Sequence, residues 1–162
     1  MSGFDFAETL KLQQQLQTME NQFDTFIRGF LLRQALDALA RTKANTPVDT
    51  GLLRAAWTVG DGVSAARGKW SDTASKVQYS EDAANSKGAT LDSVQRVGND
   101  LIVTIINPVE YASFVEYGHM TRDRTNWIEG KFMCTIAIDE VAKLMPQRFQ
   151  TEFAAWAGGL ER

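Results

Sequence analysis

Hydrophobic residues at the start of the chain recur at alternating steps of four and three, the spacing of one face of an α-helix. The series runs through Leu12, Leu16, Met19, Phe23, Phe26 and Phe30. No proline precedes Pro47, so we predict one long helix over residues 5–42. At about 1.5 Å per residue, such a helix is longer than a small domain is wide. Either its first half packs on a partner, or the helix bends near Gly29.

The next part of the chain predicts short strands around an inserted segment. Residues 45–60 suggest a corner followed by a strand. Residues 61–92 hold few large apolar side chains, and Trp70 and Tyr79 are their only aromatic residues. Long segments of this kind are usually arms or disordered. We expect an extended arm that docks on a neighbouring protein through these two side chains.

The last part of the chain predicts a hairpin and two more helices. The hairpin, over residues 93–107, turns at a Gly-Asn-Asp sequence. Residues 108–162 predict a short helix closed by Gly118, a polar loop, and an apolar helix kinked at Pro146. We therefore expect a single α+β domain over residues 1–162. The expected fold consists of a long N-terminal helix, a small antiparallel sheet with the inserted arm, and a C-terminal helix packed on that sheet.

The stretch TPVDTGLLRAAW contains Asp49-Thr50-Gly51, which is also the active-site tripeptide of aspartic proteases. A catalytic Asp-Thr-Gly follows a buried strand and faces a second aspartate with which it shares a proton. Here the tripeptide follows a helix end and Pro47, and the sequence has no second Asp-Thr-Gly. We interpret the segment as a structural corner formed with Arg54, in which Asp49 caps the next turn and Gly51 changes the chain direction.

Other candidate chemistry is sparse. The chain has 162 residues, a net charge of −3, one cysteine and one histidine. His119 could loosely hold a cation with Glu116 and Asp123, although a polar loop is the simpler interpretation. With Arg122 and Arg124, the same histidine could meet a phosphate or an acidic partner. We expect no enzyme activity, no metal and no cofactor.

Targeting signals are not evident either. No stretch approaches the roughly 20 apolar residues of a membrane span, so we expect no membrane contact. The start MSGFDFAETL lacks the pattern of a secretory signal. We expect the protein to be made in the cytoplasm of its host.

Two motifs in this order resemble a family of small bacteriophage tail components, the lambdoid gene-product-ten-like proteins, which are called head–tail joining, neck or tail-completion proteins. The first motif is PVDTGLLR, from Pro47 to Arg54. The second is a helix that matches at Tyr111, Ala112, Val115, Glu116, Tyr117 and Gly118, and the loop that follows it begins at His119. The form YGHMTRD…WIEGKFM is similar to the branch of contractile-tailed phages and phage-derived tail machines. Many other members have threonine where His119 stands. The resemblance covers about residues 20–157, apart from 61–92.

The resemblance implies an α+β fold and a ring, commonly of six subunits, between capsid and tail, without catalysis. We therefore expect a structural virion protein of the neck that joins head to tail, or completes the tail, and lets DNA pass. The alternative is a tail terminator ring that caps the tail tube. An assembly chaperone, or a small hydrolase using Asp49 or a cation at Glu116 and His119, also stays open.

The expected partners follow from this interpretation. They are further copies of the chain in a ring, which we expect to be a hexamer, and the neighbouring neck or connector, tail-tube or terminator proteins. Double-stranded DNA is expected to pass through the lumen without sequence-specific binding. A mildly acidic chain suits a channel wall, since phosphate binding needs clustered lysine and arginine. The protein is expected in the neck or tail region of the virion. The candidate interface residues are Leu12, Leu16, Met19, Trp70, Tyr79, Arg122 and Arg124.

Overall fold

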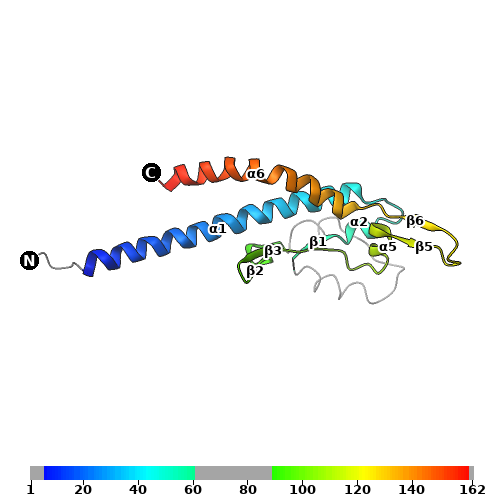
Figure 1. The fold of residues 1–162 in the computed structure, drawn as a ribbon, viewed down its shortest axis with the longest axis horizontal. Coiled ribbons are helices and arrows are strands. Elements are labelled where there is room, and N and C mark those ends of the chain that lie inside the picture. Colours follow the sequence, from blue (N-terminus) through cyan, green and yellow to red (C-terminus); the bar gives the residue numbers. More distant parts are fainter. Residues whose placement is uncertain (1–5, 61–88, 161–162) are drawn as a thin grey trace, which may run out of the picture.

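The computed structural model describes residues 6–60 and 89–160. Its longest dimension is set by two helices that lie side by side, with the short strands gathered beneath one end of the pair (Figure 1). Most of the predicted arm, including Trp70 and Tyr79, falls outside the described residues. The structure is α+β, as the sequence predicts.

Helix α1, Phe6–Asn45, is an unbroken helix of 40 residues. It is continuous through Gly29, and no sharp kink is visible along its length (Figure 1). The helix ends where Thr46 precedes Pro47, as expected because a residue before proline avoids the helical conformation. The N-terminal part of α1 extends beyond the rest of the structure (Figure 1).

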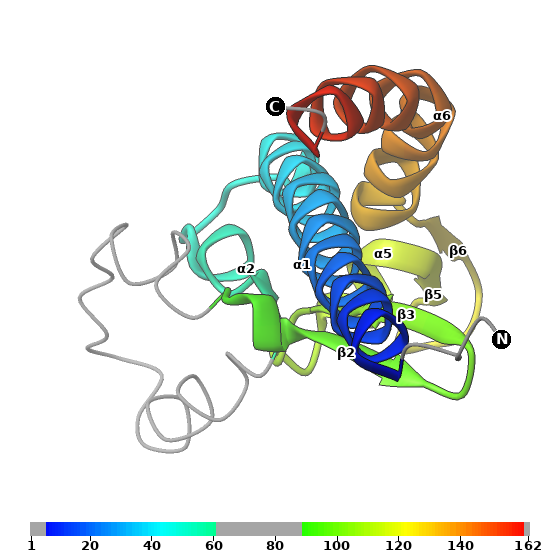
Figure 2. The ribbon, with the colours of Figure 1, turned by 90° about the vertical axis from the view of Figure 1, so that its left-hand side faces the viewer.

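Helix α6, Met133–Leu160, runs antiparallel to the second half of α1 (Figures 1 and 2). It makes its most extensive packing with α1. The helix continues through Pro146 and changes direction part-way along its length (Figure 2). Proline explains such a bend, because it has no N–H for the helical hydrogen bond and its ring crowds the preceding turn.

The strands form three separate antiparallel pairs. Their bounds are β1 Thr58–Val59 with β4 Ile105–Ile106, β2 Val94–Val97 with β3 Asp100–Val103, and β5 Gly118–Met120 with β6 Trp127–Glu129. The β2–β3 pair is the predicted hairpin, turning at Gly98 with a φ of 62°. The β5–β6 pair stands where the sequence predicts only a polar loop.

Three short helical segments connect these strands to the long helices. They are α2 Leu52–Ala55, the 3-10 turn η1 Leu91–Ser93, and α5 Ala112–Tyr117. One buried apolar cluster joins α2 and α5 to β1 and to both long helices. Its members are Ala35, Leu39, Leu53, Trp57, Val59, Ala112 and Met133. The sequence motifs around Leu53 and Ala112 therefore meet at the core.

Candidate interaction surfaces

The corner between α1 and α2 is held by two polar contacts and one unusual backbone conformation. Gly51 has a φ of 82°, in the left-handed region that glycine adopts without strain. The guanidinium of Arg54 donates to the carbonyl of Thr46 at 2.8 Å, which covers the end of α1. The hydroxyl of Thr50 accepts from the N–H of Leu52 at 3.4 Å.

The cap residue of α2 is Gly51, and α2 has no side-chain cap hydrogen bond there, so the cap expected from Asp49 does not form. The hydroxyl of Thr50 takes the hydrogen bond nearest to that role. Aspartate and threonine both suit the start of a helix. Here the direction of the chain brings the Thr50 hydroxyl, and not the Asp49 carboxylate, to the N–H of Leu52. Arg54, by contrast, has a contact that fits the motif: it ties the second helix to the end of the first.

Glu116, in the second motif, is a buried carboxylate with 4% of its surface exposed. It accepts hydrogen bonds from the N–H of Cys134 at 3.1 Å and from the N–H of Thr135 at 2.9 Å. The hydroxyl of Thr135 also donates to it at 2.8 Å. These amides lie in the first turn of α6, which has unpaired N–H groups and a partial positive charge. Glu116 therefore caps α6 from a different helix.

Two glycines allow the β5–β6 hairpin to pass close to α5. A Cβ on Gly118, whose φ is 87°, would lie 2.6 Å from the carbonyl oxygen of Ile128. A Cβ on Gly130 would lie 2.2 Å from the carbonyl oxygen of Glu116. The N–H of Lys131 donates to the carbonyl of Val115 at 2.7 Å. This close approach explains the glycine that ends the second motif. The sequence does not predict this role for Gly130, because a single glycine in a polar segment has no pattern that indicates close packing.

The tip of the β5–β6 hairpin is ordered by a polar turn. Asp123 accepts from the hydroxyls of Thr121 at 2.5 Å and Thr125 at 2.8 Å. The hydrogen bonds from these two hydroxyls hold the pKa of Asp123 below its ordinary value. Arg122 and Arg124 are both exposed on this tip, and Arg124 has a φ of 57°. The tip presents two guanidinium groups on a defined turn.

His119 lies against an aromatic ring and not in a cation site. Its ring centre is 5.6 Å from that of Phe114, and its Nδ1 is buried without a partner among the described residues. Glu116 is occupied by the start of α6. No group of three or more His, Cys, Asp or Glu within residues 6–60 and 89–160 is placed to hold a metal ion.

An apolar surface surrounds this hairpin. Its exposed side chains come from α5, β5 and β6, and they are Phe114, Tyr117, Met120, Trp127 and Ile128. The sequence predicts a polar loop over residues 119–127 because its few apolar residues stand singly among polar and charged ones. Pairing of β5 with β6 brings them together: Met120 lies opposite Trp127, and His119 opposite Ile128.

The first half of α1 carries a second apolar surface, the N-terminal stripe, which we define as Leu12, Leu16 and Met19. These side chains are 55%, 59% and 50% exposed. The stripe continues the seam that Phe23, Phe26 and Phe30 form along the same helix face. That part of the seam is covered by aromatic residues of α6, namely Phe149, Phe153 and Trp156. At least half of each stripe side chain is therefore left open to solvent by the described parts of the chain.

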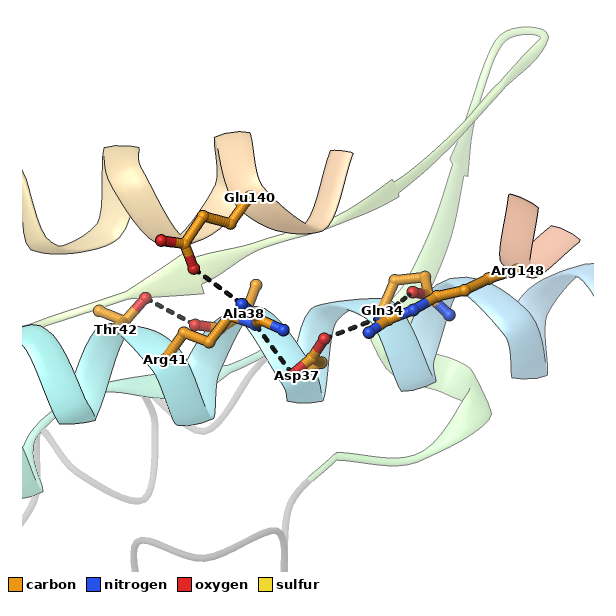
Figure 3. A network of polar contacts seen from close by, with 7 residues as sticks. All are labelled: Gln34, Asp37, Ala38, Arg41, Thr42, Glu140 and Arg148. Atoms are coloured by element: carbon orange, nitrogen blue, oxygen red, sulfur yellow. Dashed lines mark hydrogen bonds and ion pairs between the residues drawn. The ribbon is translucent and has the colours of Figure 1, made fainter. Parts of the chain in front are cut away.

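Polar contacts also join α6 to α1 (Figure 3). Arg148 donates to Asp37 at 2.8 Å and to the buried Gln34 at 2.7 Å. Arg41 bridges Asp37 at 3.1 Å and Glu140 at 2.7 Å. Burial alone would raise the pKa of Asp37, but the hydrogen bonds from Arg148 and Arg41 outweigh it and lower the pKa. The long helices therefore form a fixed pair.

Comparison with known proteins identifies the family of this chain. The family model described as "Bacteriophage HK97-gp10, putative tail-component" matches residues 11–118. The chain belongs to this family. The resemblance inferred from the two motifs is thereby confirmed, and the protein is a phage tail component. Searches among curated proteins and among solved structures gave no match.

The matched residues of this tail component include the corner, all of α5 and most of α1. They end at Gly118, so β6 and α6 lie outside them. The stripe falls within the match. A family of tail components is structural, which fits the described residues, where buried polar groups serve as caps and helix clamps. None of the helices in the described parts of the chain has the length and apolar character needed to cross a membrane.

Proposed function

We propose that this tail component is a structural protein of the phage neck, where copies form a closed ring that joins head to tail or completes the tail and lets DNA pass. One observation carries the proposal: the N-terminal stripe, exposed on a helix that extends past its own domain. Large apolar side chains aligned on one helix face are costly to leave in water and usually mark an interface. A subunit built this way needs neighbours.

A ring in a neck also has to contact proteins along its axis. The surface around the β5–β6 hairpin supplies a second contact region of different chemistry, with exposed aromatic residues beside Arg122 and Arg124. It lies at the opposite end of the molecule from the stripe (Figure 1). Subunits with two unlike surfaces can bind one neighbour within a ring and another in the next layer.

The arginines of the long helices support a channel that DNA can pass without binding. Their guanidinium groups are paired with carboxylates: Arg28 with Asp24, Arg33 with Glu152, Arg41 with Asp37 and Glu140, and Arg148 with Asp37. Arg96 of β2 is paired in the same way with Asp24. Non-specific DNA binding depends on unpaired Lys and Arg that replace counterions along the phosphates. Paired arginines on a chain of net charge −3 offer little of this.

The test is genetic. Deleting the gene should leave filled heads and separate tails, and a plasmid copy should restore joined particles. Tails of normal length that fail to join indicate a joining protein, whereas tails of abnormal length indicate a terminator. Fully assembled, infectious particles or active tail machines from the deletion strain would refute a neck role. Absence of the protein from purified particles, measured by mass spectrometry, would mark it as an assembly factor.

A point variant tests the stripe within the same strain. Leu16→Glu places a charge in the middle of the stripe and should abolish complementation. Gln14→Glu adds the same charge on the same helix, at an exposed position away from the stripe, and should complement normally. Full complementation by Leu16→Glu would remove the observation on which the proposal rests.

A further inference from the structure

The tip of the β5–β6 hairpin, residues 121–126, carries two cations without an ion pair. Arg122 and Arg124 are exposed, and neither has a carboxylate partner among residues 6–60 and 89–160. Asp123 stands between them in sequence, but its oxygens accept hydrogen bonds from the hydroxyls of Thr121 and Thr125. Five other arginines do have carboxylate partners in the same molecule. The two guanidinium groups of the tip are therefore available to another molecule.

The tip has a defined shape before any partner binds. The N–H of Thr121 donates to the carbonyl of Asn126 at 2.9 Å, and the N–H of Arg124 donates to the carbonyl of Thr121 at 2.8 Å. The hydroxyl of Thr121 accepts from the N–H of Asn126 at 3.1 Å. Because these hydrogen bonds already order the turn, a partner that binds here pays a smaller entropic cost than it would with a flexible loop.

An apolar face stands beside the two arginines. Residues directly opposite each other on paired strands have their side chains on one face, so Met120 and Trp127 lie together. These side chains are 47% and 57% exposed, and Tyr117 is 63% exposed. Tryptophan, tyrosine, methionine and arginine are enriched where protein partners bind, whereas lysine is depleted, and residues 117–129 contain no lysine. The composition is that of a surface that docks on a protein.

The charges of the hairpin favour a protein over DNA as its partner. Non-specific DNA binding grows with the number of phosphates that are neutralised, and the tip offers two guanidinium groups. Glu129 is exposed and lies on the same face as Trp127, two residues along β6, where its charge would repel a phosphate. Two guanidinium groups beside aromatic rings match a protein surface on which carboxylates border an apolar patch, since arginine and carboxylate form strong, directional pairs.

A second copy of this chain is a poorer match than a different protein. Contact between two hairpin tips would bring four guanidinium groups together, and like charges facing each other at an interface are costly. Of the seven carboxylates on α1 and α6, four already bind arginines of their own chain, namely Asp24, Asp37, Glu140 and Glu152.

We propose that the tip of the β5–β6 hairpin docks on an acidic patch of a different structural protein of the particle. Arg122 and Arg124 bind carboxylates of that protein, and Trp127 packs on the apolar surface beside them. This inference rests on the proposed neck role and names the partner chemistry of its second contact region. An exposed ion pair alone contributes little, so the aromatic side chains that exclude water from the arginines are part of the contact.

Zero-length crosslinking tests the contact in the assembled particle. Arg122→Lys and Arg124→Lys, made separately, keep the positive charge and should complement the deletion strain. A carbodiimide joins a lysine amine to a carboxylate only where the two groups touch. We expect peptide mapping to show position 122 or 124 joined to an aspartate or glutamate of a different particle protein. Particles that contain these variants and show no such link would overturn the proposal, and so would a link to another copy of this chain.

Charge reversal provides a second readout. Arg122→Glu should lower the yield of infectious particles or active tail machines about 100-fold, because like charges would then face each other. Lys143→Glu makes the same change of charge at an exposed position of α6 and should complement like the wild type. Both proteins should keep the wild-type circular dichroism, since the changed side chains are exposed. Replacing the crosslinked carboxylate of the partner with arginine should raise the yield of Arg122→Glu by about 10-fold or more.

Two further results separate this inference from its alternatives. Titration of the purified protein with a short DNA duplex at low salt should show no binding that Arg122→Glu removes, and micromolar binding that this variant abolishes would overturn the choice of a protein partner. Normal particle yield from Arg122→Glu would also overturn the docking contact. In that case the neck role would still stand on unjoined heads and tails in the deletion strain, so the two proposals can fail separately.

Discussion

The most specific prediction concerns Glu116, whose buried carboxylate caps α6 from α5. Glu116→Ala would leave the N–H groups of Cys134 and Thr135 without their acceptor, together with the hydroxyl of Thr135. Loss of a helix cap costs about 0.5–2 kcal/mol, and a hydrogen bond to a charged group contributes about 1.5–3 kcal/mol. These contributions overlap because they share one carboxylate and water can reach part of the gap. We expect a loss of about 2–4 kcal/mol in the free energy of unfolding.

Glu116→Gln sharpens this prediction. The amide keeps one acceptor oxygen but loses the charge and turns a donor toward one backbone N–H, so we expect a smaller loss of about 1–2 kcal/mol. Glu110→Ala, at an exposed position just before α5, is the matched control and should stay within about 0.5 kcal/mol of wild type. Urea unfolding followed by far-UV circular dichroism measures all three. A Glu116→Ala protein as stable as the control would refute the cap.

Three further predictions concern the corner, the helix clamp and the cysteine. Gly51→Val should lower the unfolding free energy by ~1–3 kcal/mol because a β-branched residue is strained at a φ of 82°; unchanged stability in urea would contradict the corner. Asp37 has a folded pKa below its ordinary value of 3.8, so its ion pairs stabilise the fold above that pH and are lost as the pH falls through the lower folded value. Asp37→Asn should therefore show less loss of stability than wild type below about pH 4 in acid titrations of unfolding. Burial raises the pKa of Cys134, so a thiol reagent at neutral pH should label it slowly in the native protein and much faster in denaturant, and rapid native labelling would count against this environment.

Spacing alone predicts the long helices and the central hairpin well. Helix α1 was expected at residues 5–42 and spans Phe6–Asn45, because a regular apolar seam without helix breakers favours one outcome. The β2–β3 hairpin follows from its glycine turn. These features depend on neighbours in sequence, which is the information that periodicity contains.

Contacts between distant residues were harder to predict. The β5–β6 strands have three residues each, too few to show alternation, and their hairpin depends on Gly130 meeting the backbone of Glu116. The cap on α6 joins residues 18 and 19 positions apart. At the corner, Asp49 and Thr50 are both plausible caps by residue type, and only the folded chain direction selects Thr50.

The two ends of this molecule are chemically unlike, with a bare helix at one end and an aromatic hairpin with two arginines at the other (Figure 1). Copies related by rotation about a single axis all point the same way. Any such assembly therefore has polarity, and its two rims expose different residues. A neck must bind a capsid portal on one side and a tail on the other, and an asymmetric subunit would give the assembly that orientation without any additional protein.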